Sequence, residues 1–169
     1  MNQKKNALKA IDIFKKQKEN ILLGSAYLIL GSNQSSPEKV YKARKNYWAA
    51  LACFQPQGHV KGLYSTYRWL ANSYFKTPEI DSITFYQLKA LSIAERLNDS
   101  EQIYQSASWV GSTFLSLGEF DKAIKYFDYG LKNTTAKTDK VGLRSMLTAY
   151  VTCLISTHAF SGADSIIKK

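Results

Sequence analysis

One pattern returns along the chain at an interval of 40 residues, and this repeat limits the possible folds more than any other feature. Three segments align without a gap: LGSNQSSPEKVYKARKNYWAAL (30–51), LANSYFKTPEIDSITFYQLKAL (70–91) and VGSTFLSLGEFDKAIKYFDYGL (110–131). A small residue stands at Gly31, Ala71 and Gly111, and a fourth copy places Val151 there. Self-similarity at this period is typical of repeat arrays, in which each unit buries its apolar face against its neighbours.

Each copy is predicted to form two antiparallel helices. The first is centred on the small residue, and the second carries small and large residues four apart, as at Ala43 and Tyr47. That spacing puts both on one helical face, where the small residue lets the next helix approach. The corners between the two helices are expected at Pro37, Pro78, Gly118 and His158. The fold class is therefore expected to be all-α, an α-solenoid of about four helix hairpins.

We expect one solenoid domain over residues 1–169. The second helix of a partial unit is placed at 1–18, followed by units at 20–57, 60–98 and 100–136 and a truncated unit at 139–169. Because both ends stop within a unit, we expect a fragment of a longer protein that self-associates through uncapped ends. A natural N-terminal cap starting at Met1 is the alternative. Candidate helix caps between units are Asp99 or Ser100, and Thr138 or Asp139.

These residues resemble the tetratricopeptide repeat (TPR) family. The third repeat, residues 100–136, carries most of the family pattern, at Val110, Gly111, Phe114, Gly118, Phe120, Ala123, Phe127 and Gly130. The second repeat, residues 60–98, departs from it at Ile83 and Gln87, where the family prefers Ala and an aromatic residue. The resemblance implies a superhelix with a concave groove, lined by the first helices, that binds a peptide or protein. Residues 89–132 also resemble the repeat regions of bacterial two-component sensor histidine kinases and of repeat-bearing transcription regulators.

The resemblance also places the residues of the expected groove. They are Tyr64, Arg68, Trp69, Asn72, Tyr104, Gln105, Ser108, Ser112, Thr148 and Thr152. The column of groove positions continues at Phe75, Leu115 and Ile155. Hydroxyls and amides suit an extended backbone, and the aromatic rings are candidate anchors. In the alternative interpretation the tryptophans pack between units and the serines are solvated. Arg68 and Asn72 resemble half of a carboxylate clamp, but the later units add no cation, so capture of an acidic terminus is not expected.

The net charge of +10 supports a competing hypothesis. Its largest clusters are Lys4, Lys5, Lys9, Lys15, Lys16 and Lys18, then Lys39, Lys42, Arg44 and Lys45. Both clusters fall on second helices, so the basic residues are expected outside the groove, on the convex side. They are expected to form a solvated lysine-rich face, because the aromatic rings needed to stack bases are not interleaved with these lysines. The alternative is a phosphate-binding stripe for nucleic acid or for an anionic membrane surface.

Catalytic motifs are lacking in the sequence. His59 and His158 have no ligand-type residue at metal spacing, and no glycine-rich phosphate loop, nucleophile triad or carboxylate pair is recognisable. Cys53 and Cys153 lie too many units apart for a disulfide. We therefore expect no enzyme activity, no metal and no cofactor.

The combined prediction is a non-catalytic module that binds a protein or peptide. Its expected place is the sensory or interaction region of a bacterial signal-transduction protein, in the periplasm if it belongs to a sensor kinase and otherwise in the cytoplasm. The alternative is a free-standing assembly scaffold, or a transcription regulator that contacts nucleic acid through its basic convex face.

Overall fold

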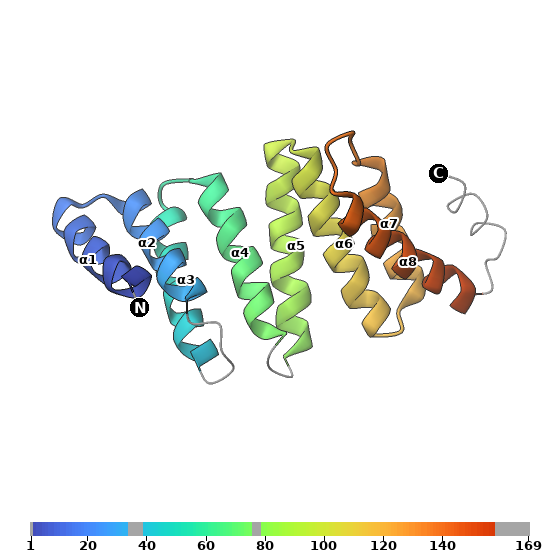
Figure 1. Cartoon of the computed structure of the whole chain (residues 1–169), viewed down its shortest axis with the longest axis horizontal. Coiled ribbons are helices and arrows are strands. Elements are labelled where there is room, and N and C mark those ends of the chain that lie inside the picture. Colours follow the sequence, from blue (N-terminus) through green and yellow to red (C-terminus); the bar gives the residue numbers. More distant parts are fainter. Residues whose placement is uncertain (1, 34–38, 76–78, 158–169) are drawn as a thin grey trace. The chain divides into compact units, whose positions relative to one another are not determined.

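The computed structural model describes residues 2–33, 39–75 and 79–157 (Figure 1). Within these ranges every regular element is a helix and no strand is present. Consecutive helices run antiparallel as hairpins, as the 40-residue repeat predicts, so the expected all-α helical-repeat solenoid is confirmed. The predicted corners at Pro37, Pro78 and His158, and the last second helix expected around Ala163 and Ile167, lie outside the described residues.

Eight helices form in this part of the chain. They are α1 Asn2–Gln17, α2 Asn20–Ser32, α3 Val40–Phe54, α4 Val60–Tyr74, α5 Ile80–Leu97, α6 Ser100–Ser116, α7 Phe120–Lys132 and α8 Lys140–Ser156. The first helices of the repeats are α2, α4, α6 and α8, and the second helices are α3, α5 and α7. The helix α1 takes the place of a second helix that precedes the first full repeat.

Polar caps and left-handed turns separate the helices. Asp99 accepts a hydrogen bond from the Gln102 N–H at 3.0 Å and so caps α6, while Asp139 caps α8. Each cap satisfies donors that a helix start leaves without an intrahelical partner. Gly118, at the expected corner between α6 and α7, has φ +72°, a left-handed conformation that favours glycine. The structure thus selects Asp99 over Ser100 and Asp139 over Thr138.

The chain divides into two compact units, residues 1–93 and 94–169, and the boundary falls inside α5. In the first unit α2 packs against α1, α3 and α4. Two glycines of α2 make this close approach possible: the ring of Phe54 lies against Gly24, and the ring of Tyr47 lies against Gly31. The small residues of the sequence pattern are therefore sites where an aromatic ring of α3 touches the backbone of α2.

In the second unit α7 packs against both α6 and α8, and these two helices also contact each other. Phe127 is completely buried and lies against Gly111, the position that corresponds to Gly31 in the first unit. Met146, Tyr150 and Cys153 of α8 complete this core. The hydroxyl of Tyr150 donates a hydrogen bond to the Asp128 carboxylate, which joins α8 to α7. The same glycine and ring contact therefore organises both units.

Candidate functional site

The predicted groove residues of α4 lie partly on its outward surface. Asn72 and Phe75 are exposed, and Trp69 keeps 37% of its surface accessible although its ring stacks on Tyr47 at 6.0 Å between centroids. Arg68 is half-buried, with its guanidinium carbon 5.4 Å from the centre of the Tyr64 ring. An amide and two aromatic rings are thus accessible near the end of one first helix.

Two of the predicted anchors belong to the core. Tyr64 and Tyr104 expose only 4% and 3% of their surfaces, so neither ring is available to a ligand. Burial raises the pKa of the Tyr104 phenol, as expected for a hydroxyl removed from water. The expectation that these two tyrosines anchor a ligand needs correction. Each lies one helical turn before a half-buried residue, Arg68 or Ser108, on a side of the helix that the neighbouring residues cover.

The hydroxyls predicted for the groove use their protons within their own helices. On α6, Ser112 donates to the Ser108 carbonyl oxygen at 2.9 Å. On α8, Thr148 and Thr152 donate to the carbonyl oxygens four residues earlier, at 2.9 and 3.0 Å. Ser112, Thr148 and Thr152 are exposed, so their oxygen lone pairs face solvent. This surface therefore offers acceptors rather than hydroxyl donors.

Gln105 is tied into a structural network. Its amide donates to one Glu101 carboxylate oxygen at 2.9 Å, and the Thr138 hydroxyl donates to the other at 3.1 Å. Thr138 also accepts a hydrogen bond from the Thr135 N–H at 2.8 Å. These bonds hold the loop between α7 and α8 against the start of α6. Gln105 is half-buried, and its amide protons are partly engaged in this contact.

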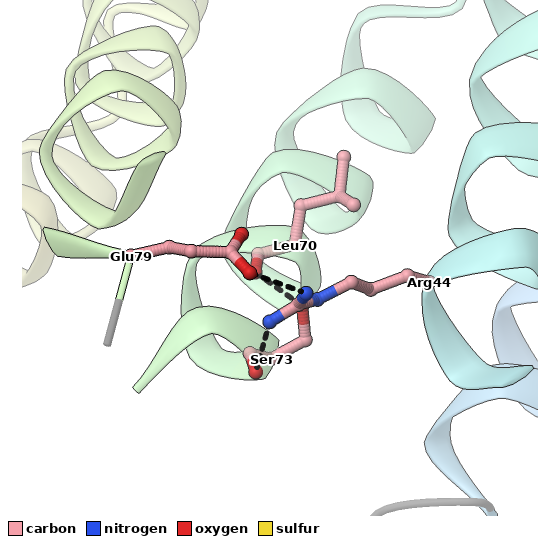
Figure 2. A network of polar contacts seen from close by, with 4 residues as sticks. All are labelled: Arg44, Leu70, Ser73 and Glu79. Carbon is pink, nitrogen blue, oxygen red and sulfur yellow. Dashed lines mark hydrogen bonds and ion pairs between the residues drawn. The ribbon is translucent and has the colours of Figure 1, made fainter. Parts of the chain in front are cut away.

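Arg44 corrects the prediction that the basic residues of α3 all lie outside. Its side chain is buried, and Nε and Nη2 donate to the hydroxyl and carbonyl oxygens of Ser73 at 3.2 and 3.1 Å (Figure 2). Nη1 lies 3.5 Å from a carboxylate oxygen of Glu79. The guanidinium also lies 3.6 Å from the centre of the Tyr74 ring. Arg44 is therefore a structural link between α3, α4 and the start of α5.

Exposed rings on the second helices were missed by the reasoning from sequence. Tyr41 and Trp48 of α3 and Phe85 of α5 expose 63%, 47% and 53% of their surfaces. Residues 41, 45 and 48 follow the i, i+4, i+7 spacing of one helical face, and 85 and 88 repeat it 40 residues later. The sequence was enough to predict that these residues share one helical face. It was not enough to predict that the rings are exposed, because a large ring at such a position equally fits the core.

Some other arrangements are not found within residues 2–33, 39–75 and 79–157. No group of three His, Cys, Asp or Glu side chains lies together as a metal site requires. No helix in the described part of the chain combines the length and the apolar character that crossing a bilayer demands. His59 accepts a hydrogen bond from the Gly62 N–H and caps α4, which is a structural role.

Comparison with solved structures identifies helical-repeat proteins. A crystal structure of BtubC (BKLC) from P. vanneervenii matches with a TM-score of 0.76 and 17% identity, over 88% of this chain and 62% of that one. TPR-like repeats of a putative kinesin light chain from Podosopora anserina match with a TM-score of 0.69 and 9% identity, over 98% of this chain and 82% of that one.

This chain therefore spans less than two thirds of the length of BtubC. Comparison of the sequence with known protein families found no match. Comparison with curated proteins found none either. At these identities the likeness concerns the architecture of the backbone, and it agrees with the repeat read from the sequence. The fold of this chain is that of TPR-like helical repeats.

Proposed function

We propose that this chain is a non-catalytic module that binds an extended segment of a partner protein on the outward faces of its first helices. The observation that carries the proposal is the acceptor column on α6 and α8. Ser112 on α6 and Thr148 and Thr152 on α8 expose their oxygens while their protons remain bonded within the helix. The N–H groups of an extended peptide are matching donors, because each can bond such an oxygen without displacing a helix bond.

Apolar residues extend the same column in both units. Phe75 after α4 and Ile155 on α8 are exposed, and each follows the polar positions of its column by about one turn. Acceptors followed by an apolar contact suit a peptide that presents backbone N–H groups and an apolar side chain on the same side. Trp69 and Asn72 add a ring and an amide donor on α4. In this proposal each unit supplies its own part of the binding surface.

The proposed biological setting is signal transduction in bacteria. We place the module in the sensory or interaction region of a bacterial signal-transduction protein, where binding shifts the conformational equilibrium of attached domains. Support comes from the resemblance of residues 89–132 to such repeat regions. A free-standing assembly scaffold is the second candidate, since the same surface serves it without any attached domain.

Selection from a random peptide library displayed on phage tests the binding surface. We expect enriched peptides to share apolar residues at alternate positions and to bind the chain in solution. Thr148→Val with Thr152→Val removes two acceptors and keeps the side-chain shape, so it is expected to weaken binding about 10-fold, since each hydrogen bond contributes roughly 0.5–1.5 kcal/mol. Lys122→Ala with Lys125→Ala, on α7, is the matched control and is expected to leave affinity unchanged.

The proposal has a clear contrary result. If no peptide is enriched above an unrelated helical protein, or if enriched peptides bind the threonine variant and the wild type equally, the acceptor column is not the binding surface. Circular dichroism before and after substitution shows whether both variants keep their helices. Asn72→Ala with Phe75→Ala repeats the test in the first unit.

A further inference from the structure

The positive charge of this protein is concentrated in its first unit. Residues 1–93 contain 14 Lys and Arg against 5 Asp and Glu, a net charge of +9, whereas residues 94–169 contain 9 against 8, a net charge of +1. The two units share the same repeat architecture, so the repeat itself does not require this difference. A strong charge asymmetry between two halves of a chain points to a polyanionic partner on the basic half.

Exposed aromatic rings lie within this basic unit, on the second helices. We call Tyr41, Lys42, Lys45 and Trp48 of α3, together with Phe85 and Lys89 of α5, the Trp48–Phe85 surface; all six side chains are exposed. Asp81 is an exposed carboxylate near the start of α5. The surface belongs to helices other than those that carry the proposed peptide site.

Buried Tyr86 joins the two helices of the surface. Its ring lies edge-on to Trp48 at 5.8 Å and edge-on to Phe85 at 5.1 Å between centroids. Tyr86 is in turn stacked on Tyr74 at 5.5 Å, and Tyr74 lies under the Arg44 guanidinium. The exposed rings of Trp48 and Phe85 are therefore held in place by packing against the buried ring of Tyr86. Fixed rings lose little conformational entropy when a ligand stacks on them.

Cationic groups accompany the exposed rings. The Lys89 ammonium lies 5.5 Å from the centre of the Phe85 ring, and the Arg44 guanidinium lies 5.3 Å from the centre of the Tyr41 ring. Arg44 is engaged with Ser73, so the charges available to a ligand are those of the exposed lysines. Lys42 and Lys45 both lie between Tyr41 and Trp48 in the sequence of α3.

We propose that the Trp48–Phe85 surface binds single-stranded nucleic acid. Lysines supply the contacts to phosphates, and each ring supplies a platform on which an unpaired base stacks. A duplex keeps the faces of its bases inside the stack, so it can use only the lysines. An anionic membrane or an acidic protein segment would also meet the lysines, but neither needs flat rings. The combination of charge with aromatic rings favours the single strand.

The test measures the fluorescence anisotropy of labelled oligo-U and oligo-dT of about 12 nucleotides, a length within the range that basic stacking grooves cover. The same assay with a duplex of equal length and with phosphatidylglycerol vesicles measures binding that depends on charge. We expect both single strands to bind more tightly than the duplex. Their affinity is expected to fall steeply between about 50 and 200 mM salt.

Two sets of substitutions separate stacking from charge. Trp48→Leu and Phe85→Leu keep apolar side chains but remove the rings, and each is expected to weaken single-strand binding about 10-fold while the binding of vesicles and duplex stays unchanged. Replacing Lys42, Lys45 and Lys89 with Gln is expected to weaken binding to every polyanion and to reduce the slope of log affinity against log salt by about 2.

Matched controls use the second unit. Replacing Lys122, Lys125 and Lys132 of α7 with Gln removes the same charge from a second helix without exposed rings. This variant is expected to bind single strands within about 2-fold of the wild type, because it lowers only the long-range electrostatic attraction of the protein for a polyanion. Tyr41→Ser provides a further ring variant, because Tyr41 is the most exposed ring of the surface and its replacement leaves the packing around Tyr86 in place.

Three results would overturn the proposal. One is equal single-strand affinity of the wild type and all three ring variants, with helices intact by circular dichroism. Another is binding of the duplex or of vesicles that equals or exceeds binding of the single strands, which would assign the surface to general charge or to a membrane. The third is an equal loss from the α7 lysine variant and from the variant of Lys42, Lys45 and Lys89.

Discussion

The ring of Phe127 on α7 lies directly against the backbone of Gly111 on α6, so closely that a Cβ atom placed on Gly111 would lie 2.6 Å from the ring carbon Cε1. Real Cβ atoms do not approach a neighbour so closely, so an alanine there forces the two helices apart. Tyr47 and Gly31 repeat this contact in the first unit. The glycine of each repeat is therefore required by the ring that lies 16 residues later in the sequence.

Gly111→Ala is expected to lower the free energy of unfolding by about 1–2 kcal/mol, since the cost of overpacking a core exceeds the gain in helix propensity. Gly130→Ala is the matched control. A Cβ on Gly130 meets the flexible Met146 sulfur at 3.3 Å, so we expect a change within about 0.5 kcal/mol or a small gain. Urea unfolding followed by circular dichroism measures both. Equal losses from Gly111→Ala and Gly130→Ala would show that the Phe127 contact is not the reason for glycine at position 111.

Arg44→Ala is expected to destabilise the first unit by about 2–4 kcal/mol, because it leaves the polar groups around Ser73 without their buried donor. Arg44→Lys should restore less than half of the loss, since one ammonium cannot reach both oxygens of Ser73 and also cover Tyr74. Thermal and urea unfolding provide the measurement. The exposed neighbour Lys45→Ala is the control, expected within about 0.5 kcal/mol. If Arg44→Lys kept the full stability of the wild type, the positive charge of Arg44 rather than its hydrogen-bond geometry would stabilise the unit.

Tyr47 makes the protein sensitive to alkaline pH. Burial raises its pKa to about 12, so the folded protein keeps this phenol protonated while the unfolded chain ionises it near pH 10. Its contribution to stability is intact below pH 10 and is lost as the pH rises from about 10 to 12.

Tyr47→Phe is therefore expected to resemble the wild type at pH 7 and to lose about 1 kcal/mol less than the wild type at pH 11. Denaturant unfolding at the two pH values measures the difference. Phe127 occupies the same repeat position in the second unit, next to Gly111, so a phenyl ring suits the site. Tyr41→Phe, at an exposed position, is the control. If it also lost about 1 kcal/mol less than the wild type at pH 11, the effect would come from the net charge of the protein and not from the burial of Tyr47.

Asp99→Ala is expected to cost about 1 kcal/mol of stability because it removes the acceptor for the Gln102 N–H at the start of α6. Asp99→Asn should retain most of the cap. Ser100→Ala, one residue later, is expected to be neutral within about 0.5 kcal/mol, since Ser100 is already the first residue of the helix. Urea midpoints compare the three variants. A larger loss of stability from Ser100→Ala than from Asp99→Ala would identify Ser100, rather than Asp99, as the capping residue.

The repeat could be predicted from the sequence because helix packing requires small and large residues at fixed spacings within each helix. The spacing of Gly111, Ala123 and Phe127 follows from helix geometry, and its return every 40 residues predicted the hairpins before any contact was known. Caps were read almost to the residue for the same reason. Asp99 and Asp139 act within one turn of their own helices, so neighbouring residues in the chain carry the whole signal.

The fate of individual side chains was decided by the tertiary structure. Arg44 carries a charge and stands in a basic cluster, yet it is buried because Tyr74 and Ser73, about 30 residues away, provide a ring face and two acceptors. Tyr64 and Trp48 are both large aromatic residues on amphipathic helices, and only the neighbouring helices bury the first and leave the second in solvent. Helical periodicity assigns a residue to a face, whereas its exposure depends on what packs against that face.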